Sequence, residues 1–184
     1  MSSIEKIKSE FDIFLKELKK PIRKDEKLLL KRVGAHLSKK YGEIMDSLEG
    51  CESPIERLFS IELNEALSDS KLNFMFDVIE CIPQYAIKIF PNTTNEKTYR
   101  IDFLVKLHDL KNDKEYGFAI ECDGHEFHEK TKEQVAKDKK RDRDLLRAGV
   151  IPIRFSGSEI YENPSSVVRD AVRIIERYSL DMYK

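Results

Sequence analysis

Two short segments, AIECDG at residues 119–124 and RIDFLV at residues 100–105, are the most informative about the fold of this 184-residue chain. Both stretches have the apolar character of buried strands, yet each is interrupted by acidic residues. Because side chains alternate along a strand, Glu121 and Asp123 are expected on one face of a sheet. A hairpin that places Asp102 beside them would bring three carboxylates together.

Apolar periodicity and capping residues predict two helices followed by the order α-β-β-β-α-β-α. The expected helices cover residues 4–18, 25–48, 53–67, 131–148 and 164–178, and the expected strands cover residues 75–90, 98–107, 116–123 and 150–155. The first three strands can pair as an antiparallel meander, after which the charged helix crosses over to the fourth strand. The predicted fold class is therefore α/β, with a mixed sheet and helices on its faces.

The chain is expected to divide near Gly50. Residues 1–50 are predicted to form an N-terminal helical hairpin, and residues 51–184 the main domain. Ser53 is a good N-cap for the first helix of that domain, and Glu56 is expected to complete a capping box. In the second strand, one face is predicted to carry Tyr99, Ile101, Phe103, Val105 and Leu107.

Charge is unevenly distributed along a chain whose formal net charge is only −1. Residues 16–40 carry ten Lys or Arg against three Asp or Glu, and residues 130–147 carry eight against four. Two basic surfaces on an otherwise acidic body suit an enzyme that acts on nucleic acid, although charge can also segregate without a function.

The sequence also indicates where the protein works. No stretch approaches the ~18 consecutive apolar residues of a membrane helix, and the N-terminus MSSIEKIKSE lacks the apolar run of a signal peptide. The three cysteines, Cys51, Cys81 and Cys122, are too far apart to suggest a disulfide framework or a CxxC zinc pair. We therefore expect a protein of the reducing cytoplasm with no membrane partner.

Three converging carboxylates would raise each other's pKa unless a cation lay between them. Mg²⁺, or Mn²⁺ in its place, is the expected cation because it prefers carboxylate oxygens and keeps several waters. Its predicted ligands are Asp102, Glu121 and Asp123. A metal-bound water can be oriented for hydrolysis of a phosphate ester, and His125 and His128 follow as a base, acid or phosphate partner. For each acid alone, the alternative is an ordinary solvated or salt-bridged side chain.

Several motifs fall in order along the chain: SPIE at 53–56, Gln84, YRIDF at 99–103, AIECDGHEFH at 119–128, DKKRD at 138–142 and IRF at 153–155. Together they resemble the very-short-patch-repair endonuclease-like branch of the PD-(D/E)XK nuclease superfamily, over about residues 53–178. The resemblance implies a restriction-endonuclease-like α-β-β-β-α-β core, which agrees with the order above. It also implies a metal-dependent endonuclease that hydrolyses phosphodiester bonds, with DNA as its partner.

The resemblance implies roles for individual residues as well. Asp102 becomes the central metal ligand, while Asp123 and His128 match catalytic positions of repair-type and homing-type relatives. Phe127 matches an aromatic residue that contacts DNA bases, and Glu56 matches a helix acid of the homing-type pattern. The basic helix that follows is expected to lie along the nucleic-acid backbone, with Lys139, Lys140 and Arg141 on the phosphates. The alternative for that helix is a solvated face.

One departure from the superfamily pattern leaves alternatives open. The usual Glu-x-Lys of the third strand is replaced by Glu121-Cys122-Asp123. Either His128 acts as the base, or a lysine from elsewhere, such as Lys88, reaches the site. Two other functions also stay open. One is an RNA-cleaving defence or toxin effector, and the other, suggested by the missing lysine, is a nuclease-fold module that binds nucleic acid without cleaving it.

Overall fold

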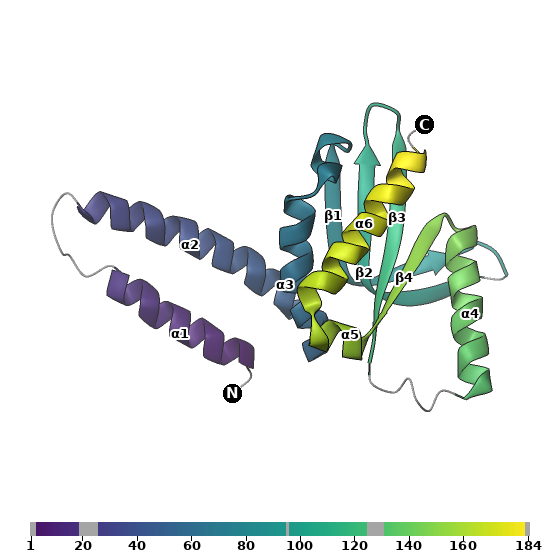
Figure 1. Ribbon diagram of the computed structural model, residues 1–184, viewed down its shortest axis with the longest axis horizontal. Helices are drawn as coiled ribbons and strands as arrows, with labels where there is room; N and C mark the ends of the chain where they lie inside the picture. Colours follow the sequence, from purple (N-terminus) through teal and green to yellow (C-terminus); the bar gives the residue numbers. More distant parts are fainter. Residues whose placement is uncertain (1–2, 19–25, 95, 125–130, 183–184) are drawn as a thin grey trace. The chain divides into compact units, whose positions relative to one another are not determined.

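The computed structural model describes residues 3–18, 26–94, 96–124 and 131–182 (Figure 1). The chain separates into two compact units, Met1–Gly50 and Cys51–Lys184. The first unit contains α1 (Ser3–Leu18) and α2 (Glu26–Glu49), where Phe11 stacks on Tyr41 with ring centroids 3.9 Å apart. The predicted N-terminal helix pair is therefore confirmed.

The second unit is built on a four-stranded sheet in the order β1-β2-β3-β4. Its strands are β1 (Val78–Ile89), β2 (Lys97–Asp109), β3 (Lys114–Asp123) and β4 (Val150–Ser156). The first three pair antiparallel, and β3 pairs parallel with β4 after the crossover helix α4 (Lys132–Arg147). This arrangement confirms the mixed sheet of a restriction-endonuclease-like core.

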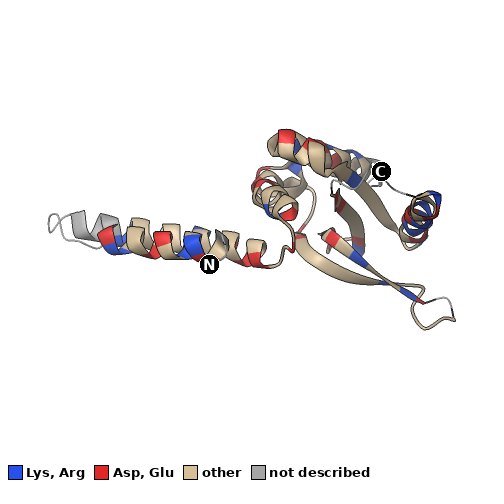
Figure 2. Cartoon of the chain, turned by 90° about the horizontal axis from the view of Figure 1, so that it is seen from below, with Lys and Arg blue, Asp and Glu red and all other residues tan. Residues whose placement is uncertain are grey.

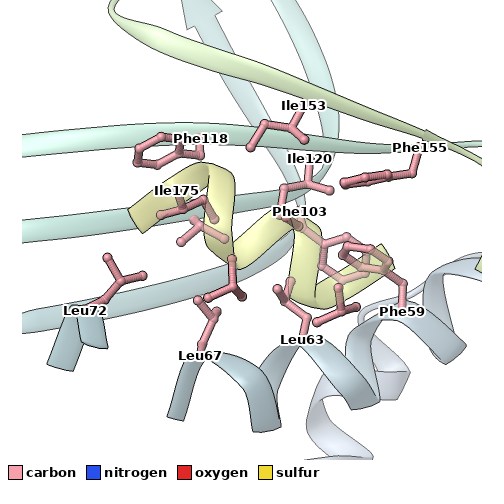
Figure 3. Packing of buried hydrophobic residues seen from close by; sticks show 14 of the residues in the cluster. Phe59, Leu63, Leu67, Leu72, Phe103, Phe118, Ile120, Ile153, Phe155 and Ile175 are labelled. Carbon is pink, nitrogen blue, oxygen red and sulfur yellow. The ribbon is translucent and has the colours of Figure 1, made fainter. Parts of the chain in front are cut away.

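Helices α3 (Pro54–Ser68) and α6 (Pro164–Met182) pack against each other over the main hydrophobic core. Figure 3 shows Phe59, Leu63 and Leu67 of α3 facing the apolar side chains of the sheet. Phe59 is fully buried, and its ring centroid lies 5.6 Å from that of Phe103 on β2. Burial of this apolar area drives the association of helices and sheet.

The start of α3 differs in one detail from its prediction. Ser53 caps the helix as expected, because its hydroxyl accepts a hydrogen bond from the Glu56 N–H at 3.2 Å. The Glu56 carboxylate does not return to the N-cap residue, however, but accepts from the Glu52 N–H at 2.9 Å. The predicted capping box is thus only half formed, and the Glu56 side chain is turned toward other polar partners.

The single apolar face predicted for β2 was wrong. Phe103 belongs to the main core, whereas Ile101 lies in a second, smaller cluster with Leu104, and Tyr99 packs against that cluster. The second cluster also contains Leu145 of α4, so both faces of the sheet are covered. Alternation breaks at Asp102, which lies opposite Gln84, a residue with a positive φ of 50°. A residue in this left-handed conformation departs from the extended backbone on which strand alternation depends.

Two short elements were not predicted. A 3₁₀ helix, η1 (Lys71–Phe74), leads into β1, and α5 (Gly157–Glu162) follows β4 directly. A Cβ atom at Gly157 would lie 2.8 Å from Ile55 Cδ1 and 3.2 Å from the Asp123 carbonyl oxygen. Glycine at this position therefore lets the turn after β4 approach the end of β3 closely.

Within the described part of the chain, none of the helices has both the length and the apolar character that crossing a membrane requires.

Candidate active site

The predicted acids lie where β2 and β3 separate. The last register pair of the two strands is Phe103 with Ile120. Beyond this pair, a side chain replaces the backbone as the hydrogen-bond acceptor. Asp102 Oδ2 accepts a hydrogen bond from the Cys122 N–H at 2.7 Å. The strand ends thus place Asp102 beside the segment that carries Glu121 and Asp123, as the sequence predicts.

Glu121 is buried on the α4 side of the sheet, with 5% of its surface exposed. Its Oε1 accepts a hydrogen bond of 2.5 Å from Nη2 of Arg141 on α4. The same nitrogen donates to the Arg100 carbonyl oxygen, and the guanidinium lies 5.7 Å from the centroid of the Tyr99 ring. Arg141 therefore points toward Glu121, and its expected contact with phosphates stays a prediction.

Asp123 is held by a second arginine. Nη1 of Arg154 lies 3.2 Å from Asp123 Oδ1 and 3.3 Å from Oδ2. The other side of the same guanidinium donates to Asp142 of α4, from Nε at 3.1 Å and from Nη2 at 3.0 Å. A chain of charges, Asp142–Arg154–Asp123, thus fixes the orientation of the Asp123 carboxylate.

Glu56 and Gln84 complete the polar surroundings of Asp102. Gln84 stands opposite Asp102 between two β1–β2 register pairs, and its φ of 50° is in the left-handed region that non-glycine residues rarely adopt. From there its side-chain amide donates to Glu56 Oε2 at 2.5 Å. The contact between Gln84 and Glu56 thus depends on a strained backbone conformation, a feature that is often retained at functional sites.

The surroundings of Asp102 and Glu121 disfavour the charged form of both side chains. Burial raises the pKa of Asp102, as do the negative charges of Glu56 and Asp123, while the Cys122 N–H and Arg141 act in the opposite direction. Burial also raises the pKa of Glu121, to about 7, with a further contribution from Asp102 and despite the opposing charges of Arg141 and Arg154. The nearby arginines do not fully offset the negative charge of these two acids, and a bound cation would offset it further.

The charged side chains of α4 point in two directions. Lys139 and Lys140 are exposed on α4, where Figure 2 shows basic residues along the outside of the helix. Asp144 of the same helix is buried, and it accepts hydrogen bonds from Lys97 at 2.6 Å and from the Tyr99 hydroxyl at 2.8 Å. The helix is thus anchored to β2 by its acid and leaves its lysines facing solvent.

The structure brings together only part of the predicted metal site, namely the carboxylates of Asp102 and Glu121. Asp102 Oδ1 and Glu121 Oε2 accept no hydrogen bond from the described residues, and both carboxylates have a raised pKa that a cation would lower. Within the described ranges, no three His, Cys, Asp or Glu side chains are already grouped for metal binding. Asp123, the third predicted ligand, is instead paired with Arg154.

Two predicted site residues, Phe127 and His128, lie outside the described residues, as does His125. Lys88, the other suggested replacement for the missing lysine, pairs in register with Thr98 on the far part of the β1–β2 hairpin. Its ammonium group lies 3.2 Å from Glu96 and is largely exposed. The structure therefore does not bring Lys88 to the acids.

Arg154 is a site residue that the sequence reasoning missed, although the sequence contains a signal for it. Arg154 interrupts the otherwise apolar strand β4, where it alternates with the core residues Ile153 and Phe155. Register with Glu121 on the parallel strand β3 then places it on the same face as the acids. An arginine inside a buried strand beside an acid-bearing strand is the pattern to search for.

Comparison with known proteins identifies one match. A family model described as REase_MTES_1575, a restriction-endonuclease-like family, matches residues 74–175. The match spans β1 to most of α6 and includes Asp102, Glu121 and Asp123, whereas Glu56 lies outside it. The same comparisons find no matching curated protein and no matching solved structure.

Proposed function

The chain belongs to the restriction-endonuclease-like family REase_MTES_1575, and on this premise we propose that it is a metal-dependent endonuclease that hydrolyses DNA phosphodiester bonds. The observation that carries the proposal is the pair of buried acids, Asp102 and Glu121, whose pKa values are raised at the point where β2 and β3 separate. Acids kept in such unfavourable surroundings are typical of functional sites.

We propose that Asp102, Glu121 and Asp123 hold Mg²⁺ or Mn²⁺. When bound, such a cation lowers the pKa of a water molecule and offsets negative charge on the phosphate. Asp102 Oδ1 and Glu121 Oε2 support the proposal because they accept no hydrogen bond from the described residues, and Arg154 holds the carboxylate of Asp123. Glu56, fixed by Gln84 and by the Glu52 N–H, adds a fourth carboxylate whose charge acts on Asp102.

The proton of the attacking water needs an acceptor, for which we propose His128. An imidazole has an ordinary pKa of about 6.5 and therefore accepts protons near neutral pH. The order Glu56, Asp102, Asp123, His128 supports the finer assignment to the very-short-patch-repair-like branch. Phe127 is proposed to contact bases, while Lys139 and Lys140 contact phosphates from the exposed side of α4.

A nuclease assay on several substrates tests the proposed function. The purified chain is incubated with supercoiled plasmid, linear duplex DNA and a structured RNA, each with Mg²⁺, with Mn²⁺ and with EDTA. We expect cleavage of DNA in either metal and none in EDTA. An Asp102→Asn preparation purified in parallel detects contaminating nucleases. Cleavage confined to RNA would replace DNA as the substrate, and no cleavage of any polymer would remove the enzyme assignment.

A further inference from the structure

Arg141 and Arg154 both contact the acids of the site, but they use their donors differently. All three side-chain nitrogens of Arg154 have a carboxylate acceptor, supplied by Asp142 and Asp123. Arg154 is thus fully engaged in holding two acids. Its guanidinium links β4 to Asp123 on β3 and to Asp142 on α4.

Arg141 uses only one of its three nitrogens toward the described residues. Nη2 donates to Glu121 and to the Arg100 carbonyl oxygen, whereas Nε is buried and has no acceptor among the residues that the structure describes. Nη1 likewise donates to no described residue. Nη1 is therefore the donor that is left for a ligand, because an unmatched donor on a charged group is unfavourable.

The surroundings of Arg141 indicate which kind of ligand it could bind. The guanidinium is steadied by Glu121, by the Arg100 carbonyl and by the Tyr99 ring, so that its remaining donors are presented from a fixed side chain. Its positive charge lowers the pKa of both Asp102 and Glu121, which places it within electrostatic reach of both acids. A planar guanidinium with spare donors matches the oxygens of a phosphate group.

We propose that Arg141 binds a non-bridging oxygen of the scissile phosphate through Nη1, the guanidinium nitrogen that neither faces Glu121 nor is shut off from solvent. This inference rests on the proposed endonuclease function. During hydrolysis the water oxygen forms a bond to phosphorus, the bond from phosphorus to the leaving ester oxygen breaks, and the water proton passes to a base. Arg141 stays protonated throughout and stabilises the charge that gathers on the phosphate oxygens.

Kinetics of matched arginine variants test this role. Arg141→Gln is expected to lower kcat by about 10²–10³-fold, as the loss of one donor to a developing oxyanion does. Arg141→Lys keeps the charge and can still bond Glu121, yet it loses the fork of donors and is expected to recover only part of the rate. The control is Arg143→Gln, an exposed arginine of the same helix, which is expected to keep kcat. Equal kcat values for the Gln variants at 141 and 143 would overturn the proposal.

A second measurement does not depend on cleavage. The Nε–H proton of Arg141 is buried, so its ¹⁵N–¹H resonance can be observed and is assigned by its absence from Arg141→Lys. Inorganic phosphate, added with Mg²⁺ present, is expected to shift this resonance. An unshifted resonance would overturn phosphate binding by Arg141, even if the wild-type protein cleaves DNA. A shift in a protein that cleaves nothing would keep the phosphate site and refute only the nuclease function.

Discussion

Asp144 and Glu121 are both buried acids beside α4, yet their surroundings act on them in opposite ways. Asp144 receives hydrogen bonds from Lys97 and from the Tyr99 hydroxyl, and these lower its pKa. Glu121 has Arg141 beside it, but burial and neighbouring acids still raise its pKa to about 7. The negative charge of Asp144 is thus matched within the protein, and that of Glu121 is not.

The difference separates an acid that stabilises the fold from acids that are available for chemistry. Asp144 ties α4 to β2, and its role is complete in the protein alone. Asp102 and Glu121 are left with raised pKa values and oxygens without partners among the described residues. Burial does not distinguish the two cases, whereas the direction of the pKa shift does.

The largest expected effect is the loss of cleavage in Asp102→Asn. Asparagine keeps the size of the side chain and can still accept from the Cys122 N–H, but it removes the ligand charge. We expect the rate to fall by about 10³-fold or more, since metal-dependent charge stabilisation is worth several kcal/mol. Single-turnover cleavage and circular dichroism measure activity and folding. Wild-type activity in a folded variant would remove Asp102 from the mechanism.

Glu121→Gln is expected to stabilise the metal-free protein at high pH. The folded-state pKa of Glu121 lies above its ordinary value of 4.5, so the folded protein binds this proton more tightly than the unfolded chain. Wild-type stability therefore falls as pH rises from about 4.5 to about 7. The variant avoids this loss of stability, which amounts to about 3 kcal/mol above pH 7.

Urea unfolding in EDTA at pH 5 and pH 8 measures this difference in the free energy of unfolding. The two proteins are expected to be close at pH 5 and to diverge at pH 8. Added Mg²⁺ is expected to stabilise the wild type at pH 8 and to have less effect on Glu121→Gln, because metal binding to the folded state adds to stability. A variant less stable than wild type at pH 8 would show that Glu121 is a structural acid like Asp144.

Asp144→Asn is expected to show the reverse behaviour. The substitution removes the charge that Lys97 and Tyr99 satisfy, so the melting temperature is expected to drop by roughly 5 °C. Cleavage at a temperature well below the transition is expected to persist, because Asp144 does not contact the acids of the site. Thermal unfolding and cleavage by the same preparation are compared. Loss of cleavage without loss of stability would place Asp144 in the mechanism.

The smallest effect per residue is expected for Lys139 and Lys140, the exposed cations of α4. Reversal of both charges is predicted to weaken binding to all duplexes alike and to lower the salt slope by about 1 for each phosphate that the helix no longer neutralises. Fluorescence anisotropy at several salt concentrations in EDTA gives both quantities. Unchanged affinity and an unchanged salt slope would mean that the exposed lysines of α4 do not bind nucleic acid.

Local patterns in the sequence were sufficient for much of the fold. Ser53 predicted the start of α3, and the acids at 121 and 123 were placed on one face of β3, because capping and alternation depend on neighbouring residues. The helices and strands of the core follow in the predicted order. The position of Asp102 near Glu121 was also predicted, because a hairpin joins their strands.

The partners of the acids depend on how distant segments of the chain pack together. Arg141 reaches Glu121 across 20 residues of sequence and Arg154 reaches Asp123 across 31, through a crossover helix and a parallel register. Such contacts depend on how helices and strands pack, which no local pattern specifies. The break in alternation at Asp102, which puts Ile101 in the second cluster, was likewise not specified by the local pattern. Neighbouring residues and one hairpin therefore suffice to predict that Asp102 lies near Glu121, whereas the packing of α4 and β4 determines that the pKa of Glu121 is raised and that of Asp144 is lowered.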